Sequence, residues 1–231
     1  MPGQHILLVE GQDDREFFQH LLCRLEFDIQ VEPETPRNFC QTASDGVDVL
    51  RTRALPLALN RIRSGDIACL GIVIDADSQT LGYGFEKRRT QYLEPLAREG
   101  YNTENPATNT DTLGEIFSHP DNLAPIGLWI MPDHRQDGAL EDLLLHSITT
   151  AQQQALLNQA DADLTLLKQH DLRLFKDKHL SKARLSTLLS WQEKPGISAG
   201  KAYRAGIFPV TTHELTSFHN WLTKLFTATQ A

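Results

Sequence analysis

Acidic residues follow three apolar runs of this sequence, each at the point where the run ends. The three groups are Glu10 with Asp13 and Asp14, Asp75 with Asp77, and Asp133 with Asp137, Glu141 and Asp142. Carboxylates held close together repel one another, so either some of them are protonated or a hard cation lies among them. Mg²⁺ or Mn²⁺ is the natural candidate, because Mg²⁺ binds a few carboxylates and takes its remaining oxygens from water and phosphate. The pattern therefore predicts metal-assisted chemistry at a phosphoryl group or a phosphodiester.

The spacing inside the first two groups indicates how their carboxylates converge. Asp75 and Asp77 are two residues apart, which places both side chains on one face of a strand for as long as the chain stays extended. Glu10 and Asp14 are four residues apart, so they lie close together if a helix begins at Asp13. We expect both pairs to contribute to one cation site.

Some of these acids have a purely structural interpretation. Asp13 and Asp14 suit the N-cap and first turn of one helix, and Glu141 and Asp142 suit the start of another. Taken alone, each of these four is more typical of a helix start than of a metal site.

The remaining acids divide differently. Asp133 and Asp137 are interpreted as solvated loop residues. Asp75 and Asp77 end a wholly apolar strand, where the sequence shows no capping role for them, and Glu10 is intermediate. Asp75 and Asp77 are therefore the strongest candidates for metal ligands.

The acids meet only if the strands that they follow lie side by side in one sheet. Apolar runs predict strands at residues 5–9, 70–74 and 126–131, with a weaker one at 29–31. Helical spacing is found between them, at residues 17–25, 47–62 and 85–99. This alternation predicts an α/β fold with a mostly parallel sheet and helices on both faces. The carboxyl ends of parallel strands share one edge, which is where such sheets bind ligands.

The pattern becomes helix-rich beyond about Ser147. We expect a metal-binding or catalytic core at residues 1–150 and a helical C-terminal extension, packed on that core, at 151–231. Helices are expected at 151–167 and 180–191, with a short apolar stretch at 207–210. The last helix carries one apolar stripe, which predicts packing on the sheet rather than an exposed partner-binding face. The stripe consists of Leu215, Phe218, Trp221, Leu222, Leu225 and Phe226.

Composition restricts the class of protein. A chain of 231 residues that is 40% hydrophobic can bury a substantial core. No apolar run is long enough to cross a bilayer and the start lacks a signal-peptide pattern, so we expect no membrane contact and a cytoplasmic location. Three cysteines without a Cys-x-x-Cys pair predict reduced, mostly buried thiols. The net charge of −8 argues against broad, nonspecific binding of nucleic acid, although it leaves room for a local basic groove.

The acidic motifs that follow the first and second apolar runs resemble those of the Toprim fold, which topoisomerases, primases and the overcoming-lysogenization-defect (OLD) nucleases share. That fold carries a Glu after its first strand and an Asp-x-Asp after its third, which match Glu10-Gly11 and Asp75-Ala76-Asp77. The Asp13-Asp14 pair resembles the OLD-type form, in which an Asp four residues after the Glu also binds metal. The resemblance implies a Toprim-like, Rossmann-like sheet over roughly the first 150 residues.

The whole chain is similar to a small group of stand-alone Toprim-like bacterial proteins whose function is uncharacterised. Further short motifs carry this similarity. They are Trp129-Ile130-Met131-Pro132-Asp133, Gly138-x-Leu140-Glu141-Asp142, Lys182-Ala183 and Trp191-Gln192-x-x-Pro195-Gly196.

The resemblance implies a role for each acid. Glu10 would be the general acid/base or a metal ligand, and Asp75 and Asp77 would be metal ligands. Asp14 and Glu141 would belong to a second metal position. The implied cofactor is Mg²⁺ or Mn²⁺.

The resemblance also implies a catalytic lysine. OLD-type nucleases carry a C-terminal lysine that stabilises charge in the transition state, for which Lys182 is the first candidate and Lys201 the second. Lys87-Arg88-Arg89 is interpreted as a solvated helix face, with contact to a nucleic-acid backbone as the alternative.

Two functions are expected from these features. The first is a Mg²⁺-dependent Toprim-like hydrolase, a nuclease or phosphotransferase that acts on phosphodiester bonds of nucleic acid. Nothing in the sequence resembles the ATPase domain of OLD proteins, so the alternative is a non-catalytic metal- or nucleotide-binding regulatory module that works with a partner ATPase. The sequence leaves a homo-oligomer open, and a role in phage defence is implied by the resemblance alone.

Overall fold

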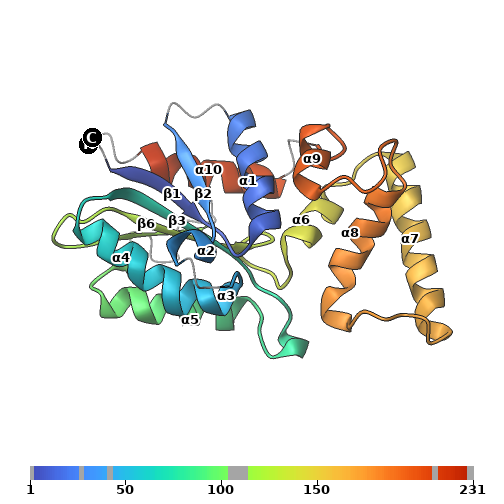
Figure 1. Cartoon of the computed structure of the whole chain (residues 1–231), viewed down its shortest axis with the longest axis horizontal. Helices are drawn as coiled ribbons and strands as arrows, with labels where there is room; N and C mark the ends of the chain where they lie inside the picture. The colour runs from blue at the N-terminus through green and yellow to red at the C-terminus, as the bar shows by residue number, and fades with distance from the viewer. Residues whose placement is uncertain (1–2, 26–28, 41–43, 104–113, 210–212, 228–231) are drawn as a thin grey trace.

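A six-stranded sheet forms the centre of the molecule (Figure 1). The structure is a computed structural model that describes residues 3–25, 29–40, 44–103, 114–209 and 213–227. The strand order is β2-β1-β3-β6-β5-β4. Four strands are parallel, namely β1 (Gln4–Leu8), β2 (Val31–Glu34), β3 (Ile67–Asp75) and β6 (Ile126–Met131). The expected parallel strands are therefore present and adjacent, and the fold is α/β.

Two antiparallel strands at one edge make the sheet mixed. β5 (Glu115–Ser118) pairs with β6, and β4 (Asn102–Thr103) pairs with β5. The apolar runs predicted no strand in this part of the chain, where residues 104–113 lie outside the described residues. Strands of two and four residues are too short to show a readable alternation of apolar and polar side chains.

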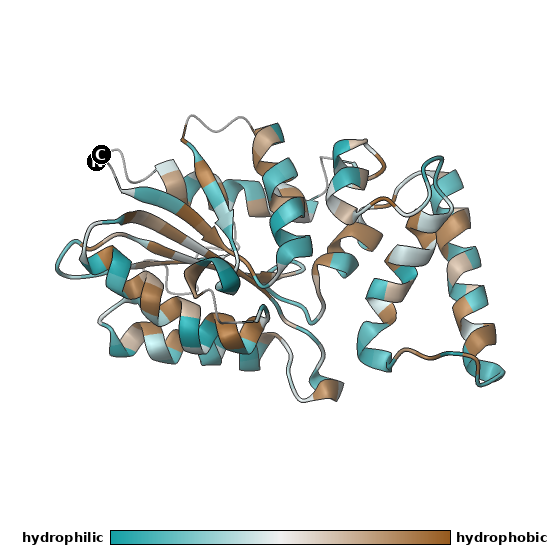
Figure 2. Ribbon diagram, viewed as in Figure 1, coloured by the Kyte–Doolittle hydropathy of each residue, from teal (hydrophilic) through white to brown (hydrophobic). Residues whose placement is uncertain are grey.

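Helices cover both faces of the sheet, as the sequence predicted. One face packs against α1 (Gln12–Leu25), α6 (Leu140–His146) and α10 (His213–Thr227). The other packs against α4 (Leu55–Arg63) and α5 (Phe85–Arg98). Successive residues of β3 enter opposite cores, which explains its continuous apolar sequence. Figure 2 shows the hydrophobic strands and the hydrophilic outer faces of these helices.

The final helix packs on the sheet, which confirms the prediction made from its apolar stripe. Gly71 of β3 lies beside Gly127 of β6 in the strand register. A Cβ atom at Gly127 would lie 2.5 Å from Leu225 and 2.7 Å from Trp221 of α10. The two glycines therefore create the shallow place in the sheet into which α10 fits.

The helical segment after β2 is less regular than its sequence pattern suggests. After α2 (Pro36–Phe39), the chain forms α3 (Val47–Val49), the π-helical turn η1 (Leu50–Ala54) and then α4. Pro56 lacks a backbone N–H and its ring crowds the carbonyl four residues earlier, which accounts for a wide turn at this point.

The C-terminal part is helical, as expected. It contains α7 (Ala151–Gln169), the 3-10 turn η3 (Asp177–His179), α8 (Leu180–Ser190) and α9 (Ala199–Arg204). In Figure 1, α7 and α8 stand at the end of the molecule away from the sheet, and α9 lies beside α1. One hydrophobic core runs from the sheet through α6 into α7 and α8. The division at residue 150 stays a prediction. Of the short apolar stretch, Phe208 is buried and residue 210 lies outside the described residues.

The cysteines differ from the expectation in one respect. None of the three is in a disulfide, but only Cys69 is buried, while Cys40 is half-buried and Cys23 is exposed because it lies on the outer face of α1. Within the described part of the chain, no helix combines the length and the apolar character that a membrane span requires.

Candidate metal centre

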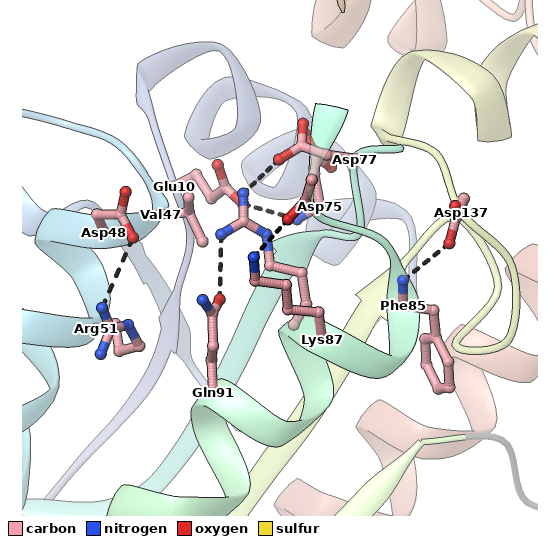
Figure 3. A network of polar contacts seen from close by, with 12 residues as sticks. Glu10, Val47, Asp48, Arg51, Asp75, Asp77, Phe85, Lys87, Gln91 and Asp137 are labelled. Atoms are coloured by element: carbon pink, nitrogen blue, oxygen red, sulfur yellow. Dashed lines mark hydrogen bonds and ion pairs between the residues drawn. The ribbon is translucent and has the colours of Figure 1, made fainter. Parts of the chain in front are cut away.

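The carboxylates of Glu10 and the β3 end meet at the carboxyl edge of the parallel strands. β1 and β3 are neighbours, with Leu8 opposite Ile72, so the residues that follow each strand emerge side by side. The backbone N–H of Asp75 donates to Oε1 of Glu10 at 2.7 Å. Figure 3 shows Glu10, Asp75 and Asp77 close together at this edge. The convergence predicted from the sequence is therefore present for these three residues.

Asp14 joins the group from the first turn of α1. The helix begins at Gln12 rather than at Asp13, which makes Gly11 the residue before the helix. The Gly11 N–H donates to Oδ2 of Asp14 at 2.9 Å, which satisfies one of the free donors of the helix start. Asp14 therefore combines the expected structural role with a position beside Glu10, whose carboxylate its charge affects.

Asp75 has a capping role that the sequence analysis excluded. Its Oδ1 accepts the backbone N–H of Leu140, the first residue of α6, at 3.0 Å. The two residues are 65 positions apart, so nothing in the local sequence shows the contact. The same contact brings Glu141, the next residue of α6, close enough for its charge to raise the pKa of Asp75.

Asp77 does not share a face with Asp75 in the way the spacing predicted. β3 ends at Asp75, and Asp77 has a φ of 58°, outside the extended region. Its backbone is fixed by two hydrogen bonds with Gly138, of 2.9 and 2.8 Å. The prediction assumed an extended chain and was wrong on this point. The Asp77 carboxylate turns instead to Arg88 of α5, with which it forms an ion pair.

Arg88 is a functional candidate that the sequence analysis missed. It is only 1% exposed, its Nη1 donates to Gln91, and its guanidinium lies 4.1 Å from the centre of the Tyr83 ring. The interpretation of residues 87–89 as a solvated face is wrong for this residue. A signal was present, because Arg88 lies four and eight residues before Tyr92 and Leu96, on the buried stripe of the helix.

Its neighbours in the basic run are also engaged. Nε of Arg89 donates to Glu115 at 3.1 Å, and Nζ of Lys87 donates to the Gly82 carbonyl at 2.6 Å. The run therefore fixes the start of α5 against the rest of the protein.

Burial and mutual repulsion perturb the pKa values of the clustered carboxyls. Burial, followed by the charge of Asp14, raises the pKa of Glu10 to about 8. Burial, followed by the charge of Glu141, raises the pKa of Asp14 to about 7. Burial and the charge of Glu10 raise the pKa of Asp75 well above its usual range, and burial raises that of Glu141. Without a bound cation, these carboxyls therefore tend to stay protonated near neutral pH, because their surroundings do not stabilise full ionisation of the cluster.

Two cavities open beside the cluster, separated by Glu141 and Lys182, which line both. A cavity of about 480 Å³ is lined by Asp75 and Asp77, and one of about 230 Å³ is lined by Asp14 and apolar residues of α6 and α8. The cluster is thus accessible to small molecules from both sides.

Lys182 reaches the cluster and Lys201 does not. Nζ of Lys182 donates to Oδ2 of Asp13 at 3.1 Å. Burial disfavours its charged form, but the hydrogen bond to Asp13 and the charges of Asp13, Glu141 and Asp14 together outweigh this and raise its pKa. Lys201 lies 3.7 Å from Glu16 and lines neither cavity. The structure places the first lysine candidate, but not the second, at the candidate centre.

The carboxylates of the cluster fit a hard cation in chemical type. Their donors are all oxygens, and the excess of buried negative charge is what such an ion offsets. Among the described residues, no three Asp, Glu, His or Cys side chains form a ready-made ligand group. Asp14 and Asp75 each direct an oxygen at a backbone N–H, and Asp77 directs one at Arg88. The cluster therefore fits a hard cation through its oxygen donors and through the negative charge that ionised carboxylates would bring together.

Three of the four acids that follow β6 have structural partners, whereas the fourth, Glu141, belongs to the cluster. Asp133 is buried and accepts the backbone N–H groups two and three residues ahead at 3.0 and 2.8 Å, which corrects its interpretation as a solvated residue. Asp137 accepts the N–H group of Gln79, in the 3-10 turn η2 (Gln79–Leu81), at 3.0 Å. It also accepts the N–H group of Phe85 at 2.9 Å (Figure 3).

Asp142 completes this third group. It accepts the Ala139 N–H at 2.9 Å and the Ser181 hydroxyl at 2.6 Å, and so joins the starts of α6 and α8. Its assignment to a helix start is confirmed.

Comparison with known proteins identifies a family but no activity. Neither curated proteins nor solved structures gave a match. A family model described as "Protein of unknown function (DUF3226)" matches residues 4–227, which is nearly the whole chain. The protein therefore belongs to the DUF3226 family.

Proposed function

We propose that this protein is a Mg²⁺-dependent hydrolase that cleaves phosphodiester bonds of nucleic acid, with a Toprim-like centre. The observation that carries the proposal is the group of five carboxylates gathered at one sheet edge beside Lys182. The five are Glu10, Asp14, Asp75, Asp77 and Glu141.

The arrangement of the strands supports the Toprim-like part of the proposal. Glu10 follows β1 and Asp75 ends β3, and these strands are neighbours in the parallel part of the sheet. This is the relation that the Glu and Asp-x-Asp motifs require if they are to act together.

The clustered carboxylates support Mg²⁺ or Mn²⁺ as the cofactor. Mg²⁺ or Mn²⁺ would be held by carboxylates of this cluster, and when bound it would polarise a phosphate oxygen and lower the pKa of water. Several neighbouring groups have raised pKa values at once, which is typical of a functional site, and a bound cation would relieve the same repulsion that protonation relieves.

Two residues have properties suited to the chemistry. Glu10, with a pKa of about 8, can hold or release a proton near neutral pH, as a general acid/base must. Lys182 stays charged beside Asp13 and lines both cavities, where it can contact a phosphate.

The substrate would bind through local charge rather than through the whole surface. The net charge is −8, but Lys178, His179 and Lys182 line the larger cavity opposite the acids. We expect weak binding of nucleic acid without metal and stronger binding with it. A cytoplasmic location and cooperation with a partner ATPase belong to the same proposal.

The test is cleavage of supercoiled, linear and single-stranded DNA with Mg²⁺, Mn²⁺ or EDTA. We expect metal-dependent cleavage by wild type and none by Glu10→Ala, with both proteins folded by circular dichroism. Metal binding without cleavage of any substrate would favour the regulatory module instead. Absence of any Mg²⁺- or Mn²⁺-induced thermal stabilisation at millimolar concentration would contradict the metal site, and with it the proposed hydrolase.

A further inference from the structure

A guanidinium lies among the carboxylates of the candidate centre. The Arg88 side chain is 2% exposed, and Nη2 pairs with Oδ2 of Asp77. The positive charge also lowers the pKa of Glu10, against the effect of burial. Arg88 therefore acts on two of the five clustered carboxylates. It comes from α5, which packs on the face of the sheet opposite to α1 and α6.

The position of this charge is fixed by the fold. Arg88 is held by α5, by the Tyr83 ring at 4.1 Å and by Gln91. Its Nε is buried and has no hydrogen-bond partner among the described residues. A buried charge with a donor that lacks a partner is costly unless an ion pair compensates for it. The ion pair with Asp77 is therefore the contact that offsets the cost of burying this guanidinium.

Asp77 is correspondingly committed to Arg88. Its left-handed backbone and its two hydrogen bonds with Gly138 direct its chain away from the line of β3. Among the described residues, no direct ion pair joins Glu10, Asp14, Asp75 or Glu141 to a basic side chain, although the charge of Arg88 lowers the pKa of Glu10 and that of Lys182, which pairs with Asp13, lowers the pKa values of Asp14 and Glu141. In the described part of the chain, the cluster thus consists of one carboxylate in a direct ion pair and four without one.

We infer that Arg88 occupies the second cationic position of the centre, so that Asp77 is its counterion and the other four carboxylates hold a single divalent ion. The inference rests on the proposed function, because it takes a metal site in this cluster as given. It differs from the sequence expectation, in which Asp75 and Asp77 bind metal together and Asp14 and Glu141 serve a second ion. An arginine suits this position because its charge cannot be lost by deprotonation.

The test is the number of Mn²⁺ ions bound per chain, counted by electron paramagnetic resonance of free Mn²⁺ and by calorimetry. Wild type is expected to bind one ion. Asp77→Asn/Arg88→Met removes both charges together, so we expect one ion with an affinity within about threefold of wild type. Arg88→Met alone leaves Asp77 unpaired and is expected to bind a second ion, whereas Arg88→Lys is expected to bind one.

Other results would overturn the inference in distinguishable ways. Two ions on wild type, or a loss of affinity above about tenfold in the double variant, would make Asp77 a ligand while the proposed metal site survives. No ion on wild type would remove the proposed function as well. If Arg88→Met does not fold by circular dichroism, the double variant decides alone, because it leaves no unpaired buried charge.

Discussion

Acidic side chains follow β3 and β6 alike, yet the two strand ends use them differently. After β6, Asp137 accepts two backbone N–H groups, and Asp142 accepts an N–H and a hydroxyl. At the β3 end, Asp75 accepts one N–H, and Glu10 beside it accepts one from Asp75, within the described residues.

The difference shows what separates a structural carboxylate from a candidate ligand. N–H donors stabilise the ionised form, so a carboxylate with several of them needs no further cation. Glu10 and Asp75 are half-buried among like charges with few donors, and their pKa values are raised as a result. The sequence pattern of acids after an apolar run is common to both sites, and the supply of donors distinguishes them.

The largest expected effect tests this difference directly, by substitution of one carboxylate at each of the two strand ends. Glu10→Ala is expected to lower metal-dependent cleavage by at least about 100-fold, because it removes the proposed acid/base. Asp137→Ala, the matched change at the β6 end, should leave cleavage within about threefold of wild type in the folded protein, because Asp137 lines the larger cavity but directs both carboxylate oxygens at backbone N–H groups outside the cluster. Initial rates on one DNA substrate measure both, and equal losses would contradict the distinction.

The two lysine candidates give a second, smaller contrast. Lys182→Ala is expected to lower the cleavage rate by about 10- to 100-fold through loss of a positive charge beside the substrate. Metal-induced stabilisation should persist in this variant, since the carboxylates are intact. Lys201→Ala serves as the control, because Lys201 pairs with Glu16 away from both cavities. A larger loss of cleavage rate with Lys201→Ala than with Lys182→Ala would show that Lys182 is not the catalytic lysine.

The pH dependence of stability tests the raised pKa values. The pKa of Glu10 is about 8 in the folded protein against an ordinary 4.5, and that of Asp14 is about 7 against 3.8. Between these limits the folded chain binds more protons than the unfolded chain, so its free energy of unfolding falls as the pH rises. Without metal, we expect the Tm to drop by about 5 °C or more from pH 5 to pH 8.5.

Two comparisons sharpen this measurement. Mg²⁺ should restore stability mainly at the high-pH end, where the carboxylates are ionised. Glu10→Gln should flatten the slope without metal, because the side chain no longer titrates. A Tm of the metal-free protein that rises over the same range would show that these carboxyls are not perturbed.

The smallest effect is expected at the structural site. Asp137→Ala removes the acceptor for two N–H groups at the starts of η2 and α5, so the free energy of unfolding should fall by about 1–2 kcal/mol. Urea denaturation measures this change. The shift in Tm caused by Mg²⁺ should equal that of wild type, and loss of the shift would mean that Asp137 belongs to the metal centre.

Much of the fold was predictable because it depends on regular local patterns. The apolar runs at β1, β3 and β6 and the helical spacing of α1, α5 and α10 identified these elements, and their alternation predicted a parallel arrangement. The antiparallel edge of β5 and β4 was missed because these strands are short. The place of α10 was predicted only as a helix on the sheet, since the register that brings Gly71 beside Gly127 is a property of the assembled strands.

The sequence by itself determined that Glu10 and Asp75 meet, because parallel neighbouring strands bring their carboxyl ends to one edge. Only the tertiary structure decided what each carboxylate contacts. Asp75 caps α6 from 65 residues away, and Asp77 leaves the line of its strand to pair with Arg88. The physical reason is that the strands and their parallel arrangement follow from local periodicity and from their alternation with helices, whereas hydrogen bonds and ion pairs depend on side-chain positions within about an ångström. Those positions are fixed only when the helices have packed on the sheet.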